Sequence, residues 1–260
     1  MNIELVINLI IGFVIAGLIC AAAYRFELLS ANGAFLAVFI GALIFGLGGL
    51  SWAMLLVVFF LSSSILPEVR VKLGYLRGMK KPKRNWRQVI VNGGPGVLLL
   101  LISFVIDADL LIWTVYCGVI AAVTADTWAT EIGIMSRNKP RSIISWKVVE
   151  KGFSGAVSLL GFAAAFSGSL MIGTLWFLFN PSANSIIPIL SITAAGFIGA
   201  LIDSLLGDVV QAQYLDQEGN ITEDAGKNRK LIRGWRWVDN DVVNLVCALV
   251  GGFTAFLIGF

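Results

Sequence analysis

Residues 3–23 read IELVINLIIGFVIAGLICAAA, an apolar run in which only Glu4 is charged. A helix crosses the hydrocarbon core of a bilayer with about 20 apolar residues, and this run has that length. A secretory signal peptide would place basic residues before a shorter apolar stretch. We therefore expect residues 3–23 to form a retained transmembrane helix, which makes the chain an integral membrane protein.

The rest of the chain has the same composition. Of its 260 residues, 58% are apolar and 13% are charged, whereas a soluble domain carries about 25% charged residues. Eight apolar segments can be drawn, at residues 3–23, 30–47, 51–66, 89–106, 109–125, 153–178, 186–208 and 238–259. The sequence predicts one membrane domain over residues 1–260, an all-α polytopic helical bundle of about eight transmembrane segments.

The second and third segments are separated only by glycine-rich residues 46–50. One straight helix over residues 30–66 would be about 55 Å long, far more than a core of about 30 Å requires. A tight hairpin at these glycines is therefore expected. Segments 51–66 and 109–125 are short, and their length leaves open whether each one crosses the whole bilayer.

The basic residues indicate an orientation. With the N-terminus outside, the loops at 24–29, 67–88, 134–152 and 211–237 lie inside and contain all 19 Lys and Arg residues. This distribution follows the positive-inside rule, so we expect a multi-pass protein of the cell membrane with cytoplasmic basic loops. Orientation and attraction to anionic lipid could be the whole role of these loops. The lipid bilayer is the expected partner, no nucleic acid is expected, and nothing in the sequence sets an oligomeric state.

Two short segments resemble each other. Residues 122–131 read AVTADTWATE and residues 199–208 read GALIDSLLGD. Each places a small residue four positions before an aspartate and an acid five positions after it, at the end of an apolar run. The match indicates a short internal repeat, and duplicated elements that meet at one site are common in membrane proteins.

Acidic side chains beside hydrocarbon are costly, so they are candidate site residues. Positions five apart on a helix point about 140° away from each other. We therefore expect Asp126 and Asp203 to face each other across two helices, with Thr127 and Ser204 as further oxygen ligands. Glu131 and Asp208 are expected to complete a metal site or to pair with the basic loops. The chain has no histidine, so a metal bound by these oxygens is expected to be Mg²⁺ or Ca²⁺, and a phosphate-bearing substrate would favour Mg²⁺.

Three further groups are candidates for binding, each with a structural alternative. Asp239, Asn240, Asp241 and Asn244 open the last segment, where acids are also good helix caps. Asn92-Gly93-Gly94-Pro95-Gly96 is expected to break a helix, and its backbone could face a phosphate. Lys151 precedes small residues that could equally serve helix packing. The expected phosphate-binding cations are Lys81, Arg84, Arg87, Lys151 and Arg236, and the chain has no P-loop motif.

Several of these stretches resemble a known family, that of transmembrane protein nineteen, also catalogued as domain of unknown function ninety-two. The resemblance covers most of residues 10–260. The stretches that carry it are Asn85 to Val89 with Asn92-Gly93-Gly94, Ala125 to Gly133, Gly199 to Gly207 with Gln211, and Asp239 to Asn244. Where the family usually has Gly-Thr-Asn-Gly-Gly-Val-Ser, residues 152–158 read GFSGAVS, which puts the substrate in question.

The plant and cyanobacterial branch of this family includes phytyl-phosphate kinase. The resemblance therefore implies a kinase that uses a nucleoside triphosphate to phosphorylate an isoprenoid or polyprenyl monophosphate. It assigns metal and phosphate roles to a set of acids and amides: Asp126, Glu131, Asp203, Asp239, Asn240, Asp241 and Asn244.

Two functions fit the sequence. The first is a Mg²⁺-dependent kinase at the cytoplasmic membrane face, with Asp126, Asp203 and Asp241 catalytic and Asn92, Asn240 and Asn244 at the substrate. The alternative is an ion-coupled transporter or a lipid flippase, because intramembrane acids and broken helices also occur in carriers. A carrier needs its acids near the middle of the bilayer, whereas these acids lie at the ends of apolar segments beside basic loops.

Overall fold

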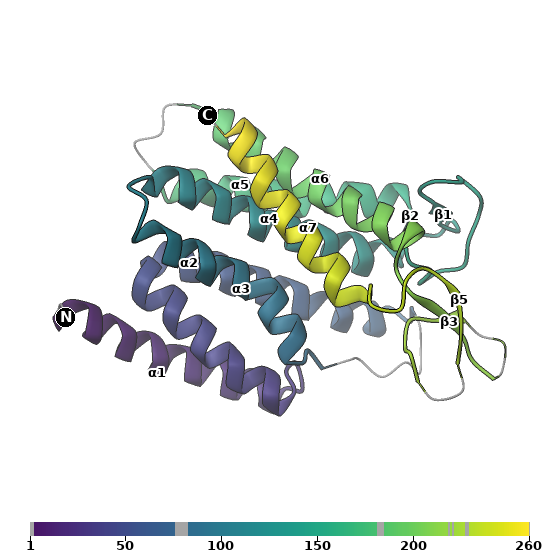
Figure 1. The fold of residues 1–260 in the computed structure, drawn as a ribbon, viewed down its shortest axis with the longest axis horizontal. Helices are drawn as coiled ribbons and strands as arrows, with labels where there is room; N and C mark the ends of the chain where they lie inside the picture. Colours follow the sequence, from purple (N-terminus) through teal and green to yellow (C-terminus); the bar gives the residue numbers. More distant parts are fainter. Residues whose placement is uncertain are drawn as a thin grey trace.

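The computed structural model describes residues 3–75, 83–180, 185–217, 219, 221–226 and 229–259. These residues form a bundle of helices that run along one direction, with the N-terminus at one end and small strands at the other (Figure 1). The helices are α1 (Ile3–Arg25), α2 (Ala31–Lys72), α3 (Trp86–Ser103), α4 (Asp109–Gly133), α5 (Leu159–Leu178), α6 (Ile187–Val209) and α7 (Asn240–Ile258). The prediction of an all-α membrane protein is confirmed.

The count of about eight spans is not confirmed. Among the described residues, six helices are long and apolar enough to cross a membrane, and α3 is not one of them. α4 is longer than the expected segment 109–125, since it has 25 residues and continues to Gly133. Segment 153–178 was drawn too long, because residues 153–158 form a turn and a strand before α5 begins.

The hairpin expected at the glycines is present inside α2. Gly49 has φ 77° and ψ −167°, a conformation that interrupts the helix and that is essentially restricted to glycine. Ile44 and Leu56 lie on either side of this residue and pack in the same apolar cluster, although a straight helix would separate them by about 18 Å. The two halves of α2 therefore run antiparallel and pack against each other.

The glycine-proline group of α3 does not break its helix, so that expectation is wrong. α3 is continuous from Trp86 to Ser103 with Pro95 inside it. The glycines serve close packing instead: a Cβ added at Gly93 would lie 2.8 Å from Ile40, and one at Gly96 would lie 2.6 Å from the ring of Tyr116. Transmembrane helices tolerate proline where neighbouring helices pack around it.

α4 is the central helix of the bundle. Almost every residue from Ile112 to Ala125 is buried, which is what a helix that is apolar all round predicts. The ring of Tyr116 stacks on Trp52 with centroids 4.2 Å apart, and its hydroxyl donates to the Trp52 carbonyl at 3.0 Å. Because α5, α6 and α7 all pack on α4, the polar end of this helix is positioned from three sides.

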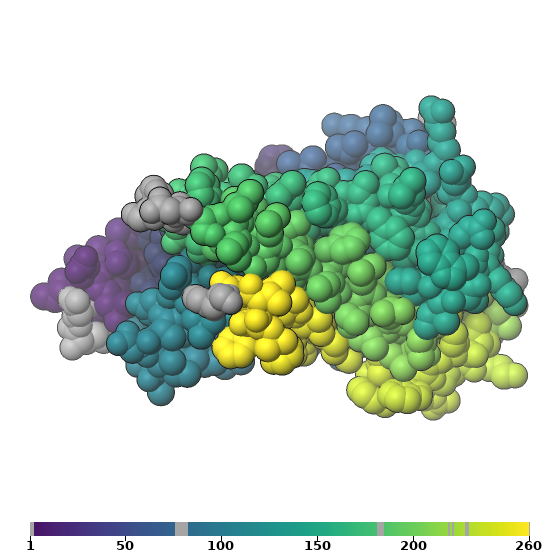
Figure 2. Space-filling model, turned by 90° about the horizontal axis from the view of Figure 1, so that it is seen from above, coloured from purple at the N-terminus to yellow at the C-terminus, as the bar shows by residue number. Residues whose placement is uncertain are grey.

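Segments 134–158 and 210–239 gather at one end of the bundle, called here the loop end (Figure 2). They contain short strands that the sequence did not predict: β1 (Arg141–Ser142), β2 (Ala156–Val157), β3 (Gln213–Leu215), β4 (Ile221–Thr222) and β5 (Lys230–Arg233). β1 pairs with β2, and β3 lies between β4 and β5. The loop end also receives the N-termini of α3 and α7, which the ion pair of Arg87 and Asp239 joins at 2.9 Å.

Candidate functional site

The two repeated segments meet where α4 crosses α6. A Cβ added at Gly199 would lie 2.6 Å from the Cβ of Ala122, so the small residues of the two repeats touch. α7 also packs at this crossing, because a Cβ added at Gly251 would lie 2.4 Å from Ala122. One turn further toward the loop end, this close packing brings Asp126 and Asp203 face to face.

The carboxyl groups of Asp126 and Asp203 are in direct contact. A side-chain hydrogen bond links the two groups. The Oδ2 atom of Asp203 is buried and has no hydrogen-bond partner among the residues that the structure describes. A buried acceptor without a donor is costly, so a cation at this point would satisfy both carboxylates.

Two polar cavities meet at this pair. The first, called here the loop cavity, lies among α4, α5, α6 and residues 151–158, and the second, called here the arginine cavity, lies among α2, α3, α4 and α7. Four residues line both cavities: Asp126, Thr130, Asp203 and Asn240. The carboxyl pair is therefore part of the wall between two spaces that molecules can occupy.

The loop cavity is bounded by a turn with two glycines at positive φ, Gly152 at 89° and Gly155 at 79°. A Cβ at Gly155 would lie 2.4–2.6 Å from atoms of Asp208, so only glycine allows this turn to approach α6. Ser158 caps α5 by accepting a hydrogen bond from the Gly161 amide at 3.1 Å. The turn thus places small polar groups and the N-terminus of a 20-residue helix at the cavity.

The arginine cavity contains both signs of charge. Arg70 forms an ion pair with Glu131 at 2.9 Å, and both side chains are largely buried. Arg84 also lines this cavity and contacts the rings of Phe59 and Phe60. Burial lowers the pKa of Arg84 to about 10, and the carboxylate of Glu131 acts in the opposite direction. Since that pKa is far above neutral, the guanidinium is charged and can bind an anion.

Three acids expected at a metal lie apart from the pair. Glu131 is paired with Arg70. The carboxylate of Asp208 accepts hydrogen bonds from Arg233 at 3.0 Å, from the Ser142 hydroxyl at 2.5 Å and from the Ile144 amide at 3.2 Å. It therefore connects α6 to both segments of the loop end. Asp239 caps α7 through the Val242 amide at 3.0 Å and pairs with Arg87.

Of the other predicted residues, some line a polar cavity and some do not. Arg84, Asn92, Asn240 and Asn244 line the arginine cavity, whereas Arg87, Arg236 and Asp241 line neither polar cavity. Lys151 lines the loop cavity, but its ammonium group donates to the carbonyls of Ile134 at 2.9 Å and Ser136 at 2.6 Å. Lys81 lies outside the described residues.

Four residues that line the polar cavities were given no site role from the sequence: Thr130, Gln88, Gln211 and Glu223. Thr130 lies one turn after Asp126, and that spacing could have indicated it. Glu223 reaches the loop cavity from the strand segment 213–233 and accepts a hydrogen bond from Ser154. No periodic pattern marks such a loop residue, because only the fold of the segment brings it there.

The donors around the carboxyl pair fit Mg²⁺. Among the described residues, no group of three or more Asp, Glu, Cys or His side chains could hold a metal ion, so the carboxyl pair would need other ligands to complete a metal site. Mg²⁺ is usually bound by one or two carboxylates together with waters and the phosphates of a substrate. The carboxylates of Asp126 and Asp203 would hold the ion, and the amide of Asn240 is a further oxygen donor in the wall.

Comparisons with known proteins agree with this architecture. The chain is 29% identical to Protein PGR of Arabidopsis thaliana over 95% of this chain and 94% of that protein. It is 28% identical to the uncharacterized membrane protein MJ0933 of Methanocaldococcus jannaschii, over 98% of this chain and 96% of that protein. No solved structure matches the chain. Residues 14–252 match the family described as integral membrane protein DUF92, and the chain belongs to that family.

Proposed function

We propose that this protein is a Mg²⁺-dependent kinase that transfers a phosphoryl group from a nucleoside triphosphate to an isoprenoid or polyprenyl monophosphate. The observation that carries the proposal is the position of Asp126 and Asp203 in the wall between two polar cavities. A kinase must bring two phosphate-bearing molecules together at one site of positive charge, and positioning with charge neutralisation supplies most of its catalysis.

The loop cavity suits the nucleotide. It opens toward the loop end, and it presents the hydroxyls of Ser154 and Ser158, the N-terminus of α5 and the turn of residues 151–158. Helix N-termini and glycine-rich turns bind phosphates through backbone N–H groups. The chain has no P-loop, so this turn would take the place of one.

The arginine cavity suits the phosphate of the acceptor. Arg84 supplies a charged group, and Asn92 and Asn244 supply amides. A lipid monophosphate is mostly a dianion at neutral pH, because its second pKa is about 6. One of its oxygens attacks the terminal phosphorus of the nucleotide, a new P–O bond forms, and the nucleoside diphosphate leaves with the electrons of the broken P–O bond. No proton has to be removed, so the absence of histidine is no obstacle.

Mg²⁺ bound at the pair would neutralise charge on both sets of phosphates. Asp126 lies seven residues before the end of α4 and Asp203 six before the end of α6, which places each about 10 Å from its helix end. The pair thus lies on the loop-end side of both helix centres, about 8 Å from them. This depth favours chemistry at the membrane face, which the positive-inside rule assigns to the cytoplasm, over an ion-coupled carrier.

Phosphoryl transfer by the purified protein tests the proposal. Protein in detergent is incubated with Mg²⁺, labelled ATP or CTP and a panel of isoprenyl monophosphates, and diphosphate products are counted. Asp126→Asn should lower turnover by a factor of about 100 or more, because it removes a charge from the metal site while keeping the shape of the side chain. Asp107→Asn, at the opposite end of the bundle, is the matched control and should leave turnover unchanged. No diphosphate from any lipid or nucleotide, with ion-dependent uptake in vesicles, would establish the carrier instead.

A further inference from the structure

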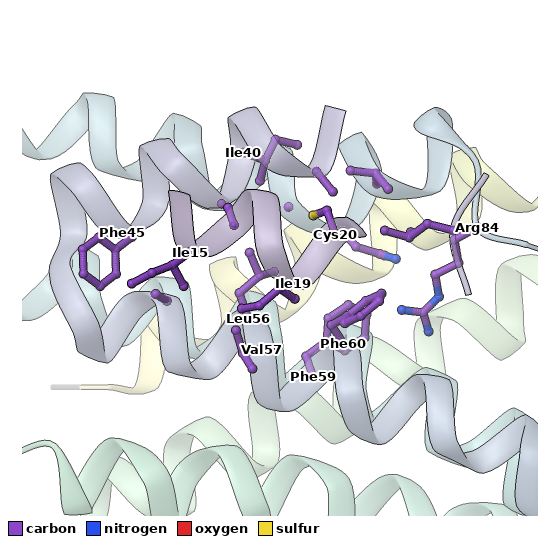
Figure 3. A pocket seen from close by; sticks show the side chains of 18 of the residues that line it. Ile15, Ile19, Cys20, Ile40, Phe45, Leu56, Val57, Phe59, Phe60 and Arg84 are labelled. Atoms are coloured by element: carbon purple, nitrogen blue, oxygen red, sulfur yellow. The ribbon is translucent and has the colours of Figure 1, made fainter. Parts of the chain in front are cut away.

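A third cavity, called here the apolar chamber, lies beside the arginine cavity. Its walls come from α1, from both halves of α2 and from the start of α3 (Figure 3). Ile15 and Ile19 face it from α1, and Leu56 and Val57 face it from the second half of α2. Its lining is almost entirely hydrocarbon. A space of this kind binds the apolar part of a ligand.

The apolar chamber ends at polar residues. Arg84, Gln88 and Asn92 line both the chamber and the arginine cavity, and no other residue that the structure describes is common to these two linings. They are spaced four apart, so Gln88 and Asn92 lie on one face of α3 and Arg84 lies just before its N-cap. These three residues therefore form the boundary at which the apolar chamber adjoins the arginine cavity, and Asp126 and Asp203 line that cavity.

Arg84 defines this junction. Its guanidinium carbon lies 5.4 Å from the ring centroid of Phe59 and 5.7 Å from that of Phe60, two rings that line the chamber (Figure 3). A cation with two amides at the end of an apolar chamber matches an anionic headgroup that carries a hydrocarbon chain.

We infer that the apolar chamber holds the hydrocarbon chain of a lipid monophosphate, with the phosphate at Arg84, Gln88 and Asn92 and facing the carboxyl pair. The identity of the headgroup as phosphoryl acceptor rests on the proposed function. The site of the chain does not rest on it, because the chamber and its junction are defined by their own residues. α1 packs chiefly on α2, so the chamber lies at the lipid-facing edge of the bundle, where a chain can enter from the bilayer.

Photo-crosslinking of the wild-type protein tests the inference directly. A farnesyl monophosphate with a diazirine on its terminal isoprene unit is bound in detergent, irradiated and located by peptide mass spectrometry. Crosslinks should fall on chamber positions within residues 12–20 and 37–60. Excess unlabelled farnesyl monophosphate should remove them, whereas inorganic phosphate should not. Crosslinks confined to helices α5, α6 or α7 would overturn the inference.

Two variants with matched controls give the second measurement. Ala53→Trp fills the chamber and should weaken binding of farnesyl monophosphate about tenfold, the effect of displacing two methylene groups. Ala21→Trp, on an exposed face of α1 outside the chamber, should have no effect. Arg84→Gln should weaken binding of the monophosphate by about 10- to 100-fold but leave binding of farnesol unchanged. Arg137→Gln, exposed and far from the chamber, is its control.

The binding readout separates this inference from the proposed function. If no nucleotide supports phosphoryl transfer but Ala53→Trp alone weakens lipid binding, the kinase proposal fails and the chamber stands. If phosphoryl transfer occurs and Ala53→Trp leaves the KM for the lipid equal to that of Ala21→Trp, the chamber is wrong and the kinase stands.

Discussion

Asp203 and Asp208 lie on the same helix, five residues apart, with different partners. Asp203 has a buried oxygen without a donor among the described residues, whereas both oxygens of Asp208 accept hydrogen bonds. A binding role needs an oxygen that protein donors leave open. At the residue scale, the chemistry of an acid in this chain follows from what its oxygens already contact.

This contrast predicts opposite effects of the same substitution. Asp203→Asn should abolish phosphoryl transfer with little change in stability, since the amide can still bond to Asp126. Asp208→Asn should lower the free energy of unfolding by about 1–3 kcal/mol, because Arg233 loses a charged partner that is 8% exposed. Thermal unfolding in detergent and turnover, measured on both variants, check the prediction. Equal losses of stability in the two would contradict it.

Sequence reasoning could place Asp126 and Asp203 together because each follows a long apolar run and a small residue at the same spacing. It offered two roles for Glu131 and Asp208, completing a metal site or pairing with the basic loops, but it could not choose between them because their partners Arg70 and Arg233 come from distant segments. It also could not assign Arg87, which pairs with Asp239 and Asp241 at the surface rather than lining a cavity. Charge type is visible in a sequence, but the partner that neutralises it is not.

At the scale of elements, the crossing of α4 and α6 decides whether the site exists. Gly199 has no room for a Cβ, since one would lie 2.6 Å from Ala122 and 3.0 Å from the Cys247 carbonyl. Gly17 on α1 has nothing within 4 Å of an added Cβ. Comparing a glycine-to-alanine change at the two positions therefore separates the effect of helix packing from the effect of helix propensity.

Gly199→Ala should lower the free energy of unfolding by about 1–3 kcal/mol through overpacking. It should also lower turnover, because the helices separate one turn from the carboxyl pair. Gly17→Ala should be neutral or stabilising by up to about 1 kcal/mol, since alanine favours the helix. Thermal unfolding and phosphoryl transfer are compared for both variants. Full activity in Gly199→Ala would mean that the close crossing does not position the pair.

Elements were predicted well where the pattern was long and apolar. α1 and α6 match their expected segments within two residues. The Gly49 hairpin was predicted because a single helix could not fit the bilayer. The group Asn92 to Gly96 was misread, because glycine and proline break an isolated helix but fit a crowded one, where Gly93 and Gly96 contact Ile40 and Tyr116. The strands of the loop end are two to four residues long, too short for any period to show.

At the scale of the whole molecule, charge is polarised. All Lys and Arg residues lie in the loops at 24–29, 67–88, 134–152 and 211–237, whereas Glu4, Asp107 and Asp109 lie at the opposite ends of the helices. Two polar cavities meet at the carboxyl pair, and the apolar chamber adjoins one of them. A site at the loop end can use a cytoplasmic nucleotide only if the loop end faces the cytoplasm.

Labelling of single introduced cysteines decides this orientation. The native residues Cys20, Cys117 and Cys247 are all buried, so a membrane-impermeant maleimide should leave them unmodified in intact cells. Asp107→Cys, in the exposed turn between α3 and α4, should react without permeabilisation, because the positive-inside rule places that turn outside. Asn138→Cys, exposed in the segment between α4 and α5, should react only after permeabilisation. The reverse pattern would put the carboxyl pair on the side without nucleotides. A cytoplasmic kinase would then be untenable, while the apolar chamber would keep its own test by crosslinking.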